Sequence, residues 1–469
     1  MDEHHAEVTR LAAATSVLDS EFRGEIFARA RDRFHATALE FGFDFGLVLR
    51  VALEVDRRQA GYDVINSAFI VAGAIAFAVA PPVSFLIGLA VLTVNIYKRY
   101  EERLIIAAQF RQDRYDPVAV NAQFDMHVPP ELMVGLPTPL QNVAIYAGYS
   151  PFDGSGTSIG NWTIAIDTSR PKQAAGAPAQ LYTLEVDSVE QALTEALARS
   201  DLPNLEVKDC LFVNGVDAAQ ITQDPLHRPA QSIDPSQLHA YEDHYPQIAR
   251  RYRWFRSASW NGELVFSAFV RCSKSGSQLI LECVHCLLSP VDDRYRTVDR
   301  LPNENARMVC REILAAMFLA PFAIAASPFL LVGRAWAALH RWFGTDATAV
   351  RRGISDRVGF NYGATSSLRA AMSGSEYRHY FQARDAETYH RIADQRITAA
   401  LLDCLDLHGV DTSKMKEQTG VILNHGIIVR DGKVDWQSLA VGTGAQASGV
   451  FSRDKGQPAT MAKARGTNG

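Results

Sequence analysis

Cysteine is scarce in this chain of 469 residues, and a secretory leader is missing from its start. The polar, acidic opening MDEHHAEVTR has no apolar stretch that could act as a signal sequence. Six cysteines are too few for a disulfide framework in a protein of this size. We therefore expect the soluble parts to lie in a reducing compartment. The six are Cys210, Cys272, Cys283, Cys286, Cys310 and Cys404.

Net charge is also small. The chain has 47 basic and 52 acidic residues, for a net charge of −5, and so offers no bulk attraction to nucleic acid. We expect no nucleic acid among its partners. Hydrophobic residues make up 47% and charged residues 21%, which excludes a disordered chain. Only 9 of the 47 basic residues are lysine, a bias typical of a GC-rich bacterial genome.

Charge is absent altogether from Val64 to Tyr97, a run of 34 residues. Pro81-Pro82 divides it into halves of 17 and 15 residues, close to the lower limit of about 17 residues for a membrane span. We interpret 64–97 as a transmembrane helical hairpin in a multi-pass protein. A re-entrant hairpin and a buried soluble hairpin are the alternatives. The first half carries alanines at four-residue spacing, which favour close helix packing in lipid; they are Ala68, Ala72, Ala76 and Ala80.

Basic residues flank this hairpin on both sides, and its turn carries no charge. The positive-inside rule then places both ends in the cytoplasm, beneath the bacterial inner membrane. No ionisable residue lies within the run, which argues against a transporter or proton path. The flanking residues are Arg57 and Arg58 before the run, and Lys98, Arg99 and Arg103 after it.

A second apolar segment runs from Ile313 to Gly333 and extends to Phe343 if Arg334 is tolerated. Pro321 and Pro328 interrupt it. We expect a second membrane or membrane-interfacial segment over 313–343. Its equally basic flanks favour a broken hairpin or an in-plane helix, which keeps the C-terminus inside, over a single span.

The soluble parts predict an α+β fold. Residues 1–60 read as helical, with Asp19-Ser20 as one cap signal and a second helix after Asp44. Residues 118–308 form a mostly antiparallel α+β domain on the cytoplasmic side, with a helix at Val189–Arg199. Asn261-Gly262 and Ser275–Ser277 are the turns of a three-stranded meander. Strands are expected at Val143–Gly148, Trp162–Asp167, Leu181–Val186, Val207–Val213, Arg251–Trp260, Glu263–Cys272 and Gln278–Leu288.

Within residues 344–453, the sequence predicts a C-terminal helix at Glu387–Leu407 followed by short β-hairpins. The hairpin turns are expected at Asn424–Gly426 and at Asp431-Gly432. Residues 454–469 are expected to be a disordered tail.

The stretch AGYSPFDGSGTSIGNW, residues 147–162, has the glycines and hydroxyls of a working loop. Gly156–Gly160 matches G-x-S-x-G, but a nucleophile elbow needs a strand before the serine and a helix after it, whereas here a strand follows. The stretch also lacks the lysine of a phosphate-binding loop. We expect no catalytic residue, metal or cofactor here, only a β–β connection whose glycines allow positive φ. Its candidate residues are Tyr146, Ser150, Asp153, Gly154, Ser155 and Gly156.

Two further motifs have mainly structural interpretations. Cys283-Val284-His285-Cys286 looks like a redox or zinc motif, but the two cysteines of a strand at this spacing point to opposite faces. No second ligand pair is visible, so we expect buried cysteines. Arg250–Arg256, RRYRWFR, mixes arginine with aromatic residues. A solvated strand is the default, and lipid headgroups are the better functional option.

Several stretches resemble a known family. They are YAGYSPFDGSGTSIGNWTIAID, NGELVFSAFVR, FNYGATSSLR, YFQARDAE and GVDTSKMKEQTGVILNHGIIVRDG. Together they resemble a family of uncharacterised actinobacterial membrane proteins that carry a Tyr-x-Gly-Tyr/Phe-Ser-Pro-Phe-x-Gly-Ser-Gly stretch, matched here by Tyr146–Gly156. Asp153 stands where that family has a small apolar residue. The resemblance implies a bacterial membrane protein and supplies no activity.

We therefore expect a membrane-anchored cytoplasmic interaction or sensing protein that self-associates and binds an unknown protein partner or ligand. One alternative is a membrane-associated enzyme with a site near the 147–162 loop, using residues such as Asp153, His227, Arg228 or His285. Another is a small oligomeric pore or effector, an interpretation supported only by the four alanines at four-residue spacing, which we call the alanine stripe. The lipid bilayer is the partner common to all three.

Overall fold

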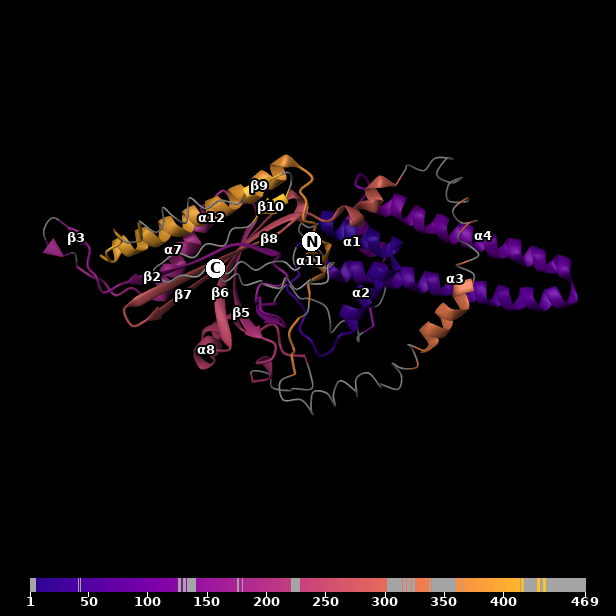
Figure 1. Ribbon diagram of the computed structural model, residues 1–469, viewed down its shortest axis with the longest axis horizontal. Helices are drawn as coiled ribbons and strands as arrows, with labels where there is room; N and C mark the ends of the chain where they lie inside the picture. The colour runs from indigo at the N-terminus through magenta and orange to yellow at the C-terminus, as the bar shows by residue number, and fades with distance from the viewer. Residues whose placement is uncertain are drawn as a thin grey trace, which may run out of the picture.

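The computed structural model describes residues 6–124, 141–220, 228–301, 325–336 and 360–416, with gaps of one or two residues, as well as a few isolated positions and the strands 428–430 and 433–435. These residues form an α+β protein, as the sequence predicts. A bundle of N-terminal helices lies beside a six-stranded sheet, and a long helical hairpin projects from the bundle (Figure 1). His4, His5 and the tail 454–469 lie outside the described residues.

The N-terminal bundle begins with α1 (Ala6–Leu18) and α2 (Ser20–Arg31). The Asp19 side chain accepts hydrogen bonds from the backbone N–H groups of Glu21 and Phe22, which confirms the predicted cap. Every residue from Val8 to Val17 is buried, including Arg10. That guanidinium lies 2.7 Å from Glu7 and 2.8 Å from Asp299, so its charge is paired inside the bundle.

The predicted hairpin is present, but its first helix is much longer than expected. α3 runs unbroken from Phe45 to Val79, capped by Asp44, whose side chain accepts from the N–H of Leu47. α4 (Pro81–Ile105) returns alongside it after a turn at Ala80. The first residues of α3 are buried in the bundle, whereas its apolar second half is exposed.

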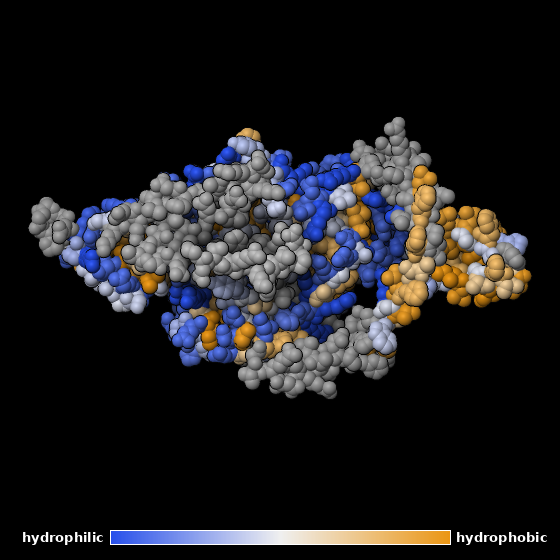
Figure 2. Space-filling model, viewed as in Figure 1, coloured by the Kyte–Doolittle hydropathy of each residue, from blue (hydrophilic) through white to orange (hydrophobic). Residues whose placement is uncertain are grey.

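Membrane-spanning character is limited to one helix of the described part. α3 is long and apolar enough to cross a bilayer, and only 11% of its most apolar window is buried, unlike the core helix of a soluble protein. α4 does not meet the same criterion, so the multi-pass prediction is not supported. Figure 2 shows the hydrophobic surface gathered on the projecting hairpin, while most of the coloured surface elsewhere is hydrophilic.

The sheet has the order β1-β5-β6-β7-β8-β2. β6 (Ala249–Ser259), β7 (Leu264–Ser275) and β8 (Gln278–Leu288) form the predicted antiparallel meander, with Asn261 at φ +54° in the first turn. β2 (Thr157–Asp167) pairs antiparallel with β8 at one edge. β5 (Leu205–Asn214) pairs antiparallel with β6, and β1 (Val143–Tyr146) runs parallel to β5 at the other edge.

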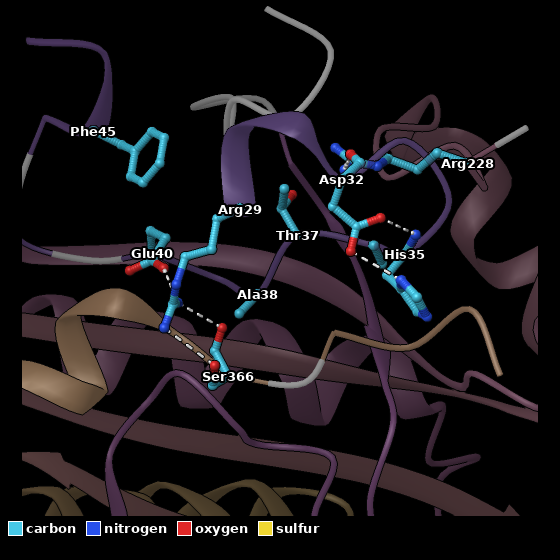
Figure 3. A pocket seen from close by; sticks show the side chains of 10 residues that line it. Arg29, Asp32, His35, Thr37, Ala38, Glu40, Phe45, Arg228 and Ser366 are labelled. Carbon is cyan, nitrogen blue, oxygen red and sulfur yellow. Dashed lines mark hydrogen bonds and ion pairs between the residues drawn. The ribbon is translucent and has the colours of Figure 1, made fainter. Parts of the chain in front are cut away.

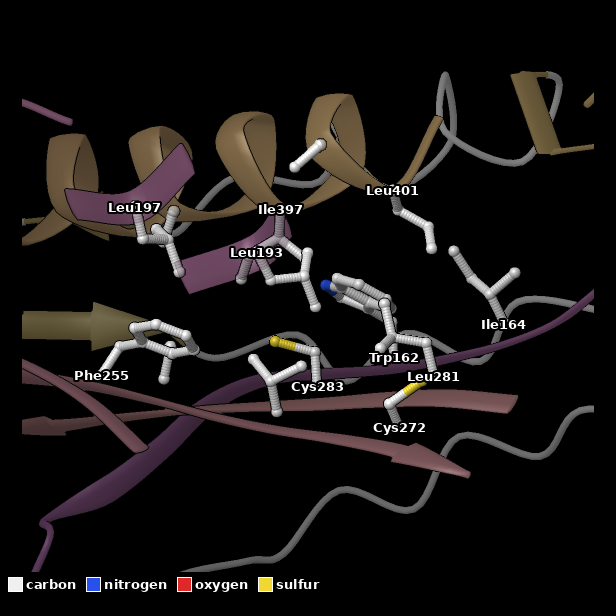
Figure 4. Close-up of a cluster of buried hydrophobic side chains, with 14 of the residues drawn as sticks. Trp162, Ile164, Leu193, Leu197, Phe255, Cys272, Leu281, Cys283, Ile397 and Leu401 are labelled. Atoms are coloured by element: carbon white, nitrogen blue, oxygen red, sulfur yellow. The ribbon is translucent and has the colours of Figure 1, made fainter. Parts of the chain in front are cut away.

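Two helices cover one face of this sheet. α7 (Val186–Ala198) and α12 (Tyr380–Leu407) lie side by side over β2, β7 and β8, where Trp162, Cys283 and Ile397 belong to one buried cluster (Figures 1 and 4). α12 contains the predicted helix 387–407 and begins seven residues earlier. The predicted strand at Leu181–Val186 is wrong: residues 180–185 are irregular and α7 begins at Val186. The N–H of Tyr182 bonds to the carbonyl of His408, so the segment follows α12 instead of joining the sheet.

The remaining elements are short. β9 (Ile428–Arg430) and β10 (Lys433–Asp435) pair antiparallel, as expected around Asp431-Gly432, whereas Asn424–Gly426 lies outside the described residues. The other helices in the described part of the chain are residues 325–336, a π-helical turn (Ile106–Phe110), α5 (Pro117–Gln123), α8 (Leu238–His244), α11 (Leu368–Met372) and the 3₁₀ segments Ala218–Gln220, Pro235–Gln237, Trp260–Gly262 and Asp293–Arg300; the minor strands are β3 (Gln173–Ala174) and β4 (Ala177–Pro178).

The loop before β2 closes the opposite face of the sheet. Phe152 stacks on Phe269 with ring centroids 4.5 Å apart and also contacts Phe212 and Tyr252. Gly156, at φ +95°, passes so close to β8 that a Cβ would stand 2.1 Å from the carbonyl oxygen of Leu287. The loop therefore needs glycine for close approach as well as for positive φ.

Replacing Gly156 by alanine should destabilise the protein by at least about 3 kcal/mol, because the backbone of β8 must move as well as the loop. Gly276→Ala is the matched control, since Gly276 also has positive φ but no atom within 4 Å of its Cβ position. That change should cost only about 1 kcal/mol. Thermal unfolding in detergent, followed by tryptophan fluorescence, measures both, and equal losses would contradict the close-approach role.

Candidate functional site

Four side chains that carry metal-binding or acid–base groups meet where α12 crosses β8. Cys283 and His285 are two residues apart on β8, so both point to the face that α12 covers. His390 and Asp394 are four residues apart on α12, which places them on one side of that helix. We call these four residues the β8–α12 cluster.

The cluster is compact and fully enclosed. Nε2 of His285 lies 3.5 Å from Oδ1 of Asp394, and Nε2 of His390 lies 3.4 Å from Oδ2 of the same carboxylate. Sγ of Cys283 lies 3.3 Å from Nε2 of His285. The imidazole rings are nearly perpendicular, with centroids 4.6 Å apart. His285, Asp394 and His390 are 0%, 3% and 6% exposed, so the four groups form one buried polar island.

The end of the 147–162 stretch completes this island. Trp162 on β2 donates its indole N–H to Oδ1 of Asp394 at 2.7 Å. Gly160 pairs with His285 across the β2–β8 ladder, next to an irregularity in the register. A Cβ on Gly160 would stand 3.0 Å from Nε2 of His390, so this glycine provides room for the imidazole rings.

Burial decides the protonation of the cluster. It lowers the pKa of His285 to about 3 and that of His390 to about 4. Both imidazoles are therefore neutral at pH 7, the form that binds metals. Burial also raises the pKa of the Asp394 carboxyl and of the Cys283 thiol.

The motif Cys283-Val284-His285-Cys286 contains two residues of the cluster, whereas His390 and Asp394 were not predicted. Cys286 does lie on the opposite face of the sheet from Cys283, as the strand geometry predicts. The missed signal was the pair His390 and Asp394 at helical i, i+4 spacing, a pattern suited to holding one ion. Nothing local in the sequence indicates that this helix lies on β8.

The other candidates from the 147–162 stretch do not gather in one place. Tyr146 is the half-buried last residue of β1, and Ser150 is half-buried in the loop that follows. Ser155 is fully buried, Gly154 approaches the carbonyl of Leu39, and Asp153 and Ser158 are exposed. These side chains do not share a pocket with a histidine, so the enzyme alternative gains no catalytic set from them.

Arg228, another residue named for the enzyme alternative, borders a small recess between α2 and the loop after it (Figure 3). His227 lies outside the described residues. The recess has a volume of about 60 Å³, room for a few waters but far below the 300 Å³ or more of a typical ligand pocket. Its charges pair internally, since Asp32 lies 2.9 Å from His35 and Arg29 lies 3.7 Å from Glu40. It is a poor candidate for a substrate site.

The arginine-rich strand was expected to be exposed to solvent, but it lies inside the sheet and its arginines are paired. β6 lies between β5 and β7, and Arg251 is buried with bonds of 2.5 and 3.1 Å to the Glu190 carboxylate. Arg253 binds Asp209 through two bonds of 2.8 and 3.0 Å. These two guanidinium groups are ion-paired with carboxylates of the same chain, so they are poorly placed to bind an anionic partner.

The alanine stripe divides along α3. Ala76 and Ala80, near the turn, are half-buried, whereas Ala68 and Ala72 are exposed. Residues four apart on a helix are rotated by about 40° relative to one another around the helix axis. The four alanines therefore cannot all face the same neighbouring helix. Gly73 faces α4, where a Cβ would meet Ile87 at 3.5 Å.

Comparison with known proteins identifies one match. Residues 161–435 match the model of a family described as having an AbeC-like domain, which covers more than half of the chain. The match contains Trp162, β8 and α12, and so the whole β8–α12 cluster, and it excludes α3 and α4. No curated protein and no solved structure matches the chain.

Changing Trp162 to phenylalanine should lower the free energy of unfolding by about 2–4 kcal/mol, because a buried carboxylate loses its donor and the indole leaves a small cavity. Trp260→Phe is the control: its indole also donates to an aspartate, Asp385, at 2.9 Å, but at an exposed position. That variant should lose less than about 1 kcal/mol. Thermal unfolding compares the two, and an equal loss would contradict a special role for the Asp394 contact.

Proposed function

This chain belongs to the AbeC-like domain family, and from that membership and its apolar hairpin we propose that it is a membrane-anchored interaction or sensing protein. The hairpin inserts into the bacterial plasma membrane from the cytoplasmic side. The AbeC-like domain is then held at the membrane surface, where it binds a protein partner or ligand and associates with further copies. The observation that carries this proposal is the exposed apolar surface of α3 and α4.

Large apolar side chains cover the outside of the hairpin. All nine of the residues named below are more than half exposed, and in water they would form an unusually large unburied patch for a soluble protein. A bilayer removes that cost. They are Val64, Val71, Ile75, Phe77 and Val79 on α3, and Phe85, Leu86, Leu89 and Tyr97 on α4.

The length of the apolar part supports insertion of the hairpin from one side. Val64–Val79 is 16 residues, or about 24 Å of helix, against a hydrocarbon core of about 30 Å. The tip therefore penetrates most of the core. Arg57, Lys98 and Arg99 lie at the base, where anionic headgroups would meet them, whereas Arg58 is paired with Glu54 and Glu101.

The second apolar segment supports an interfacial arrangement. Residues 325–336 are helical and lie beside α3 (Figure 1). Arg334 pairs with Asp56 at 3.1 Å and Asp63 at 3.3 Å, and Ser327 contacts Asn66 at 3.4 Å. These contacts hold the helix at the base of the hairpin, while Phe329 and Val332 remain exposed. A helix at that level fits the membrane surface better than a span.

Self-association has one supporting feature. Ala68 and Ala72 do not face α4, so on the inserted hairpin they would present small side chains to lipid. Small residues at this spacing allow the helix of another copy to approach closely.

Arginine in the middle of the hairpin should release the protein from membranes. Ile75 and Leu86 are 63% and 62% exposed and lie about 16 Å above the base of the apolar part. Each arginine there costs about 2.5–3.5 kcal/mol, so Ile75→Arg with Leu86→Arg should weaken partitioning more than about 1,000-fold. Flotation with phosphatidylethanolamine–phosphatidylglycerol vesicles measures the bound fraction.

The matched control places two arginines on exposed apolar residues away from the hairpin, Val118→Arg with Leu407→Arg. This variant should float like the wild type. Unchanged flotation of the hairpin variant, or equal loss in the control, would exclude the hairpin as the anchor.

Cysteine labelling tests the side of the membrane. Tyr149 and Leu407 are exposed, and the described native cysteines are buried, so single cysteines at these positions report accessibility once Cys310 is replaced by serine. In spheroplasts, an impermeant maleimide should label both only after the membrane is permeabilised. Labelling of either position in intact spheroplasts would contradict a cytoplasmic domain.

A further inference from the structure

We propose that Cys283, His285, His390 and Asp394 bind one zinc ion, which joins β8 to α12 inside the AbeC-like domain. This site is independent of the proposed membrane attachment, because none of its residues lies on α3, α4 or residues 325–336. The inference starts from the geometry of the β8–α12 cluster.

The donor atoms of three of these residues are close enough to share one ion. Ligand atoms held 2.0–2.3 Å from tetrahedral zinc lie about 3.3–3.6 Å from one another. The donor atoms of His285, His390 and Asp394 all lie within 4.8 Å of one another, and Nε2 of each histidine lies 3.5 or 3.4 Å from a different oxygen of the Asp394 carboxylate. Cys283 is outside this group of three; its Sγ lies 3.3 Å from Nε2 of His285 and has to turn toward the other two residues to become the fourth ligand. The two histidine–aspartate distances are also long for N–H···O hydrogen bonds, which centre on about 2.9 Å.

Both imidazole rings border a space that a glycine leaves open. A Cβ on Gly160 would stand 3.8 Å from Nδ1 of His285 and 3.0 Å from Nε2 of His390. Both rings are more than nine-tenths buried, and it is their Nε2 atoms that face the Asp394 carboxylate.

The net charge of the bound ion and its ligands favours a divalent cation and a thiolate as the fourth ligand. A divalent cation bound to one carboxylate, one thiolate and two neutral imidazoles is a unit of zero net charge, which a hydrophobic core can hold. Binding requires the Cys283 thiol to lose its proton, which passes to solvent as the zinc–sulfur bond forms. Imidazole and thiolate donors favour zinc over magnesium or calcium, which prefer oxygen.

The enclosure of the site indicates a structural ion. His285 has no exposed surface, so a substrate cannot reach an ion bound to it. The Trp162 indole N–H, bound to Asp394, orients the carboxylate in the way that outer hydrogen bonds orient metal ligands. The ion would link strand and helix segments more than 100 residues apart in the sequence.

Metal content of the purified full chain, without a histidine tag and in detergent, tests the proposal directly. Mass spectrometry of the metals should find about one zinc per chain in the wild type and less than about 0.1 in His390→Gln and Asp394→Asn. His244→Gln, an exposed histidine outside the cluster, is the control and should retain its zinc. No zinc in folded wild type, zinc unchanged in the cluster variants, or stoichiometric magnesium or calcium instead would overturn the proposal.

Because a cluster variant can fail to fold, two measurements use folded protein. Removing metal from the wild type with a chelator should lower its melting temperature, and adding zinc back should restore it. Cobalt-loaded wild type should show a thiolate-to-cobalt charge-transfer band that Cys283→Ser abolishes and Cys286→Ser, on the opposite face, retains. A melting temperature unmoved by chelator and zinc, or a band equally present in both serine variants, would overturn the assignment.

Discussion

Both ends of the α3–α4 hairpin are embedded in the same hydrophobic core, and this constraint governs how the protein can meet a membrane. Val48 and Val51 at the start of α3 are buried together with Ile106 and Phe110 just after α4. A single crossing would separate these residues across the bilayer and break the core, which no gain from burying one apolar helix would offset. The proposed insertion must therefore begin and end on one side of the bilayer.

A band of polar contacts marks where the hairpin leaves the folded body. Asn66 and Asn95 exchange hydrogen bonds of 3.1 and 3.3 Å between α3 and α4, and Ser327 joins them from more than 200 residues further along the chain. Below this band Arg334 is paired with acids of α3; above it the hairpin carries no charged side chain and its surface is mainly apolar. Residues 325–336 of the second apolar segment thus lie against the base of the hairpin, and under the proposed attachment neither segment needs to be a complete span by itself.

Local signals in the sequence predicted local structure well. The caps at Asp19 and Asp44 and the Asn261-Gly262 turn depend on neighbouring residues alone, and each is found as expected. The predictions were wrong where contacts between segments far apart in the sequence determine the local structure. Residues 181–186 alternate like a strand, yet the N–H of Tyr182 bonds to the carbonyl of His408 at the end of α12, and α3 runs without a break from the bundle into the hairpin. The β8–α12 cluster joins Cys283 to Asp394, and no pattern within either segment predicts that contact.

The 147–162 stretch has two separate structural roles, one on each face of the sheet. Its first part, through Phe152 and Gly156, seals one face of the sheet, and its last part, through Gly160 and Trp162, makes room for and orients the buried cluster on the other. The AbeC-like match begins within the last part, at residue 161, and contains all four cluster residues, whereas the hairpin lies before it. Attachment and the cluster therefore belong to separate parts of the chain. If both proposals hold, the domain keeps its metal when detached from lipid, and the hairpin binds lipid whether or not the metal is present.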